Sequence, residues 1–157
     1  MNEKFKKLNL SLIIAIAGMI VYDVALFIGY FYSISYVKDQ LKYEKAITSK
    51  FEGNANADKL EHLINNAQIA TWFIVATLII LVIALIITII NRAKANKSLQ
   101  LIIIGLCAIV GILFIVGLAF GTPILALISL LLLIPAYRGY KELNSAQSVV
   151  QQVYTQQ

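Results

Sequence analysis

Apolar runs long enough to cross a membrane dominate the hydropathy pattern of this 157-residue chain. A hydrocarbon core about 30 Å thick needs roughly 20 residues of helix, because each residue advances the helix by about 1.5 Å. The runs at 8–32 and 69–90 satisfy this length. The region 99–140 is longer than one span, so the pattern predicts four spans in all.

The long apolar region is interrupted at Phe120-Gly121-Thr122-Pro123. Thr122 is a favourable helix cap, and Pro123 fits a first helical position, where its missing N–H costs nothing. We therefore expect two helices here, at 99–119 and 123–138, joined by a very tight turn.

The connection at 33–68 is too long for a simple turn. Its two arms carry apolar residues at helical spacing on either side of a middle, 51–58, that is rich in turn formers. The predicted fold is an all-α integral membrane four-helix bundle, residues 1–143, with an extracytoplasmic helical hairpin between spans one and two. Residues 144–157 form a polar cytoplasmic tail, for which a weak amphipathic helix and disorder are both open.

The composition agrees with a membrane protein. Hydrophobic residues make up 60% of the chain and charged residues 13%, whereas soluble domains carry about 45–50% apolar and roughly 25% charged residues. A soluble core in so short a chain cannot absorb that excess, so a lipid-facing surface is expected. The length leaves room for one integral membrane domain.

Basic residues gather on one side of the predicted spans. They flank the spans at both ends of the chain and in the loop 91–98: Lys4, Lys6, Lys7, Arg92, Lys94, Lys97, Arg138 and Lys141. The 33–68 connection carries five lysines balanced by five acidic residues. By the positive-inside rule, both termini and the loop 91–98 are expected in the cytoplasm, with the protein in the plasma membrane.

An acidic residue, Asp23, lies well inside span one. Intramembrane acids are costly and usually face a bundle interior or water. Arg138, the last residue of the fourth predicted span, is the only lysine or arginine in any of these spans, and none lies at the depth of Asp23. The candidate partners of this intramembrane polar site are therefore neutral: Tyr22, Tyr30, Thr71, Thr77 and Ser129. Low dielectric without a nearby cation favours the neutral form of a carboxyl group. Three roles are open for Asp23: a structural hydrogen bond, contact with another subunit, and proton or cation coupling.

Small side chains mark two candidate helix-packing surfaces, because close backbone approach rather than hydrophobicity drives helix association in lipid. One face of span one carries five of them: Ser11, Ala15, Gly18, Ala25 and Gly29. Gly117 and Gly121 form a GxxxG pattern at the end of span three. We interpret both mainly as contacts within the bundle, with homodimerisation as the alternative.

Enzymatic chemistry has little support in the sequence. It contains no paired carboxylates, no nucleophile beside a base and no glycine loop for phosphate. The single histidine, His62, has no set of metal-binding partners, and the single cysteine, Cys107, is expected to pack as a small hydrophobe. We expect no catalytic, cofactor-binding or metal-binding residue. No basic stretch interleaved with aromatics lies outside the spans, so nucleic acid is not an expected partner.

Several features of the layout occur together: the start Asn2-Glu3-Lys4, the long first connection, Trp72 at the head of span two, the basic loop 91–98 and the closing runs LIIIGLCAIVGILFIVG and ILALISLLLLIPAY. In these features the chain resembles small four-span membrane proteins of unknown function from Gram-positive bacteria. The resemblance lends no functional residues. The acid in span one is also similar to the coupling acid of small multidrug-resistance transporters, but the long connection and an aspartate in place of glutamate depart from that family.

The expected function is that of a non-enzymatic multi-pass plasma-membrane protein, an accessory, immunity-type or interaction subunit. Its expected partners are the lipid bilayer and either another membrane protein or further copies of itself. The alternative is a small proton-coupled transporter or oligomeric pore that uses Asp23.

Overall fold

The computed structural model describes residues 3–48 and 55–156 as helices joined by short turns. In chain order the elements are α1 (Glu3–Thr48), α2 (Ala55–Lys94), α3 (Lys97–Gly117), the 3₁₀ helices η1 (Leu118–Phe120) and η2 (Ile124–Leu132), and α4 (Leu133–Gln156). No strand occurs within the described ranges, which confirms the all-α class for them.

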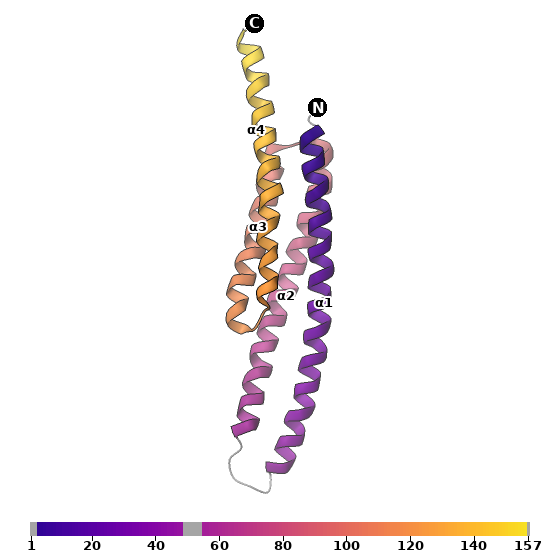
Figure 1. Cartoon of the computed structure of the whole chain (residues 1–157), viewed down its shortest axis with the longest axis vertical. Helices are drawn as coiled ribbons and strands as arrows, with labels where there is room; N and C mark the ends of the chain where they lie inside the picture. Colours follow the sequence, from indigo (N-terminus) through magenta and orange to yellow (C-terminus); the bar gives the residue numbers. More distant parts are fainter. Residues whose placement is uncertain (1–2, 49–54, 157) are drawn as a thin grey trace.

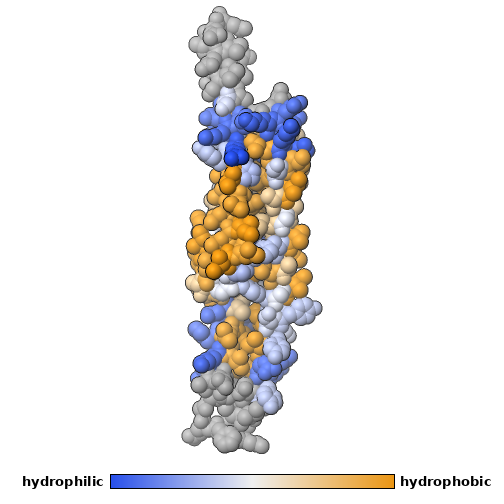
Figure 2. Space-filling model, viewed as in Figure 1, coloured by the Kyte–Doolittle hydropathy of each residue, from blue (hydrophilic) through white to orange (hydrophobic). Residues whose placement is uncertain are grey.

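Four helical segments of the described chain are long and apolar enough to cross a membrane: Glu3–Tyr43, Asp58–Lys94, Lys97–Phe120 and Ile124–Ser145. Each overlaps one of the four spans expected from the sequence and extends beyond it at one end or both. On the face drawn in Figure 2, a hydrophobic band crosses the middle of the molecule between hydrophilic patches. Such a band is the surface that a hydrocarbon core would contact.

The helices pack in chain order, with α1 on α2, α2 on α3, α3 on α4 and α4 back on α1. Successive helices run in opposite directions, so both ends of the chain and the α2–α3 connection lie at one end of the bundle (Figure 1). Apolar side chains from α1, α2, α3, η2 and α4 fill the space between the helices, among them Leu12, Ile16, Leu81, Val110, Phe114, Leu132 and Ala136. This arrangement is an up-and-down four-helix bundle.

At the other end, α1 and α2 continue past the α3–η2 turn as a pair (Figure 1). α1 stays helical to Thr48 and α2 begins at Ala55, so both arms of the 33–68 connection are helical as expected. Val37, Ile64 and Ala67 are among the residues that line a small apolar groove of about 190 Å³ between the two arms. Residues 49–54 lie outside the described residues, and with them the first half of the turn-rich middle at 51–58. The second half of that middle, 55–58, is already helical in α2.

The turn between the third and fourth spans differs from its prediction. Thr122 does not cap the fourth helix: its hydroxyl donates to the Phe114 carbonyl of α3 at 3.3 Å. Pro123 has an extended backbone and precedes the first helical residue instead of being that residue. Carbonyls in the last turn of a helix have spare hydrogen-bonding capacity, so the buried Thr122 hydroxyl is satisfied by folding back on α3.

The fourth span begins as the 3₁₀ helix η2 and continues as α4 to Gln156, so the tail is helical over 144–156. η2 approaches α3 closely where Leu130 lies over Gly111. A Cβ added at Gly111 would clash with Leu130 Cδ2. A glycine at this position therefore lets the two segments pack.

Gly117→Ala should destabilise the bundle. A Cβ at Gly117 would lie 2.7 Å from Cγ2 and 2.9 Å from Oγ1 of Thr122, and overpacking of this kind costs about 1–3 kcal/mol. Thermal unfolding of the purified protein in detergent should show a lower midpoint for the variant than for the wild type.

Gly105→Ala is the matched control on the same helix, since no atom lies within 4 Å of a Cβ added there. Alanine favours helix over glycine by about 1 kcal/mol, so this midpoint should equal or exceed that of the wild type. If Gly117→Ala and Gly105→Ala lowered the unfolding midpoint equally, the packing described for the α3–η2 turn would be contradicted.

Candidate functional site

A carboxyl group lies buried inside the bundle. Asp23 of α1 is fully buried, and its Oδ2 lies 2.8 Å from the Thr77 hydroxyl of α2. The same hydroxyl lies 2.8 Å from the carbonyl oxygen of Ile74 in its own helix. One side chain from each helix thereby joins α1 to α2 within the segments long and apolar enough to span a membrane.

The hydrogen bonds of this pair can be arranged in two ways, because the Thr77 hydroxyl has one proton to donate. When Asp23 is ionised, it accepts a hydrogen bond from the Thr77 hydroxyl. A protonated Asp23 can instead donate to Thr77, which then donates to Ile74. Both arrangements use the same heavy-atom positions, so either charge state fits this packing. The second oxygen, Asp23 Oδ1, and the buried Ser129 hydroxyl have no hydrogen-bond partner within the described chain.

The other candidate partners do not bond to Asp23. The Tyr30 hydroxyl donates to the Gly121 carbonyl and ties α1 to the turn before η2. The Thr71 hydroxyl donates within its own helix, and Tyr22 is partly buried against the core. Of the predicted site residues, the structure therefore brings together Asp23 and Thr77, whereas Tyr22 and Tyr30 make their contacts elsewhere.

The small-residue face of α1 does not pack inside the bundle, so its interpretation as an intrachain contact is wrong. Four of its five members are exposed: Ser11, Gly18, Ala25 and Gly29. The fifth, Ala15, is partly buried against the core. A Cβ added at Gly18 or at Gly29 would meet no atom within 4 Å.

The rotation of α1 explains this outcome. Leu12, Ile16 and Met19 are buried and lie at steps of four and three that lead to Asp23. At about 100° per residue, this face lies roughly 120° around the helix from Gly18 and its neighbours. Burying the acid and the large apolar residues together therefore turns the small residues outward.

The two glycines near the end of span three do lie at intrachain contacts. Gly117 is buried against Thr122. Gly121 adopts the left-handed backbone conformation that favours glycine, with φ of 103°, and its carbonyl accepts the bond from Tyr30. Their shared role is to close the turn between the third and fourth spans.

Sequence reasoning missed a polar network at the other end of the bundle. The buried Asn91 side chain of α2 donates to Gln100 Oε1 of α3 at 3.0 Å, and Gln100 Nε2 donates to the Ala136 carbonyl of α4 at 2.9 Å. Asn91 Oδ1 also accepts from the Asn96 amide in the connecting loop at 2.7 Å. The sequence pattern that could have indicated this network is an amide side chain at the end of span two, Asn91, followed by another at the start of span three, Gln100.

The described residues contain no group of three or more His, Cys, Asp or Glu side chains that could hold a metal ion. His62 is exposed on α2. Cys107 is fully buried in the apolar core, as expected for a small hydrophobe.

Comparison with known proteins finds no protein-family model, no curated protein and no solved structure that matches this chain. The resemblance to four-span proteins of Gram-positive bacteria stays a prediction.

Asp23→Asn should assemble in the membrane and unfold within about 1 kcal/mol of the wild type, because an asparagine oxygen can still accept from Thr77. Thr77→Val should lower the free energy of unfolding by about 1–2 kcal/mol, since it leaves a buried carboxyl group without its partner. Denaturant titration in mixed micelles measures both changes.

Thr88→Val is the matched control for Thr77→Val. Thr88 is also buried on α2, but its hydroxyl donates to the Ala84 carbonyl of its own helix at 2.6 Å. Thr88→Val should lower the free energy of unfolding by less than Thr77→Val does. If both variants lower it equally, the hydrogen bond from α2 to Asp23 adds nothing to stability.

Proposed function

We propose that this protein is a non-enzymatic, multi-pass plasma-membrane protein of bacterial type that works as an accessory, immunity-type or interaction subunit. The observation that carries the proposal is the exposed small-residue face of α1. Glycine on a lipid-facing surface gains nothing from lipid, whereas it lets a second helix approach closely. The proposed partner is a transmembrane helix of another membrane protein or of a second copy.

The same face continues along α1 beyond the small residues. Stepping by seven from Ala25 reaches Tyr32, and stepping by seven from Gly29 reaches Tyr36 and Tyr43; all three rings are more than 60% exposed. Steps of seven keep residues on nearly one side of a helix, and exposed tyrosines are frequent anchors in protein interfaces. One side of α1 thus offers small residues within the apolar band and aromatic rings beyond it.

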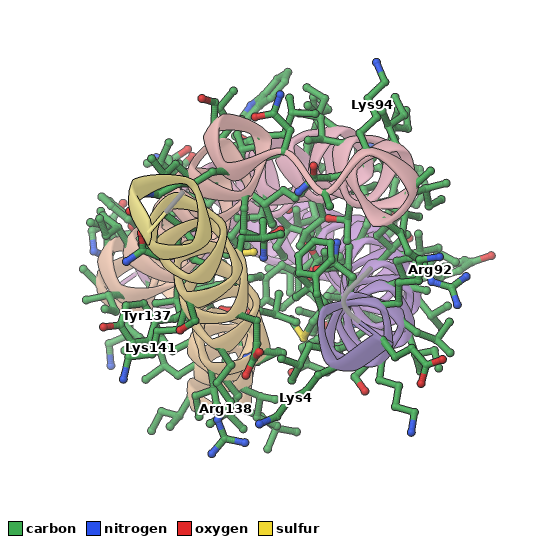
Figure 3. The ribbon with its side chains drawn as sticks, turned by 90° about the horizontal axis from the view of Figure 1, so that it is seen from above. Lys4, Arg92, Lys94, Tyr137, Arg138 and Lys141 are labelled. Carbon is green, nitrogen blue, oxygen red and sulfur yellow. The ribbon has the colours of Figure 1, made fainter. Side chains whose placement is uncertain are left out.

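We propose that the extension of α1 and α2 is an extracytoplasmic helical hairpin and that both termini are cytoplasmic. The cations labelled in Figure 3 all belong to the end of the bundle that holds the chain termini: Lys4, Arg92, Lys94, Arg138 and Lys141. Basic residues concentrate on the cytoplasmic side of membrane proteins. The extension, in contrast, balances its lysines with acids.

Cysteine labelling in intact cells tests this topology. On a Cys107→Ala background, Asp39→Cys should react with a membrane-impermeant maleimide in intact cells, because Asp39 is exposed on the extension. Ser145→Cys, exposed near the basic end, should react only after the membrane is permeabilised. The opposite pattern would contradict the proposed orientation.

Gly18→Leu should break the complex without unfolding the bundle, because the leucine side chain would enter the partner's space while meeting no atom of its own chain at the Cβ position. Blue-native electrophoresis of host membranes in mild detergent should show the wild-type complex replaced by the lone chain.

Gly105→Leu is the control for this experiment. Gly105 is likewise exposed, lies on α3 and has no atom within 4 Å of an added Cβ. Its complex should migrate like that of the wild type. If Gly18→Leu also leaves the complex intact, the face of α1 is not the binding surface.

A small proton-coupled transporter or oligomeric pore is the second candidate function. The observation in its favour is the Asp23 carboxyl group, buried in the apolar interior with one oxygen lacking a hydrogen-bond partner within the described chain. In liposomes this candidate requires a pH-dependent flux that Asp23→Asn abolishes while the variant still assembles. A flux that does not depend on the protein would remove it.

A further inference from the structure

A surface groove at the basic end of the bundle has the lining that a phospholipid needs. It has a volume of about 460 Å³, runs between α1 and α2, and is lined by Lys6, Leu10, Ile13, Ile89, Arg92 and Ala93. The two cations lie nearest the helix ends. The large apolar residues follow at about one to two helical turns deeper along α1 and about one turn deeper along α2.

Lys6 and Arg92 are the two cations of this groove, and neither has an ion pair or a side-chain hydrogen bond within the described chain. Glu3, one turn before Lys6, forms no ion pair with it. Other cations at this end are engaged in an ion pair, a hydrogen bond and a cation–π contact: Lys4 with Glu142 at 3.3 Å, Lys97 with Asn144 at 2.9 Å and Lys141 with the Tyr137 ring at 5.4 Å. Two positive charges from different helices are thus left facing one groove.

We infer that this groove binds an anionic phospholipid of the surrounding leaflet. The phosphate lies between Lys6 and Arg92, where a guanidinium group offers paired donors to phosphate oxygens and an ammonium adds a point charge. An acyl chain lies along Leu10, Ile13 and Ile89. Basic pockets between transmembrane helices on the cytoplasmic side are a recognised setting for anionic head groups.

The apolar floor of the groove points to lipid as the source of the phosphate. Leu10 is 41% and Ile89 53% exposed, and both lie within segments apolar enough to span a membrane. A soluble anion would use the two cations and leave this floor uncovered, whereas a phospholipid covers both at once. The inference rests on residence in a membrane and does not depend on the partner proposed for α1.

A general positive field at this end is the rival explanation, and the chain offers a matched control for it. Arg92 and Lys94 lie two residues apart on α2 but point in different directions (Figure 3). Lys7 and Lys94 are exposed and do not line the groove. Lys7→Gln/Lys94→Gln therefore removes the same two charges as Lys6→Gln/Arg92→Gln while leaving the groove unchanged.

Native mass spectrometry of the delipidated full chain, titrated with phosphatidylglycerol or phosphatidylcholine of equal chain length, tests the inference. The wild type should bind phosphatidylglycerol more tightly. Lys6→Gln/Arg92→Gln should weaken that binding by about tenfold or more, and Lys7→Gln/Lys94→Gln by less than about threefold. Ile89→Ala, which changes no charge, should weaken it by about threefold.

Each other result would overturn the inference. Equal losses of phosphatidylglycerol affinity in the two double variants would mean that the lipid is attracted by the general positive charge of this end and not by the groove. Equal binding of the two lipids would mean that the head-group charge is not recognised. Displacement of phosphatidylglycerol by inorganic phosphate would mean a site for free anions, and an unaltered affinity in Ile89→Ala would mean that no acyl chain occupies the groove.

Discussion

Inside a bilayer a buried polar group finds no water, so each hydrogen bond between helices holds those helices in one register and one rotation. Two buried polar contacts join the helices within the described residues. Asp23 of α1 meets Thr77 of α2, and Gln100 of α3 bonds both to Asn91 of α2 and to the Ala136 carbonyl of α4. The first contact lies on the side of α1 that also carries the buried residues Leu12, Ile16 and Met19. The second ties the other three helices together at the basic end.

That rotation divides α1 into three sides. The inward side carries Asp23 with the large apolar residues, the second side carries the small residues that include Gly18, and the third side contributes Lys6 to the basic groove. At about 100° per residue these sides are roughly 120° apart. A protein partner on the small-residue side and a phospholipid in the groove would therefore occupy separate surfaces, and the interior would be left to hold the helices.

The sequence predicts the four spans and the helical arms of the long connection because span length and helical spacing are local properties of the chain. It also predicts that a neutral side chain such as Thr77 bonds to Asp23, since no lysine or arginine lies at the depth of Asp23 in any predicted span. Periodicity tells which residues share a face of α1, but the packing of three other helices decides which face points inward, so the small residues were assigned to the wrong side. The bonds of Thr122 and Gln100 depend on where distant carbonyls lie, and no local pattern contains that information.

Native mass spectrometry of the wild-type chain, purified through a tag from its own host in a mild detergent or nanodisc, tests most directly whether the protein is an interaction subunit. We expect a complex of fixed stoichiometry, in which this chain is bound to one other membrane protein or to further copies of itself. A chain that carries lipid alone, under conditions that preserve known membrane complexes from the same cells, would contradict the role of an interaction subunit.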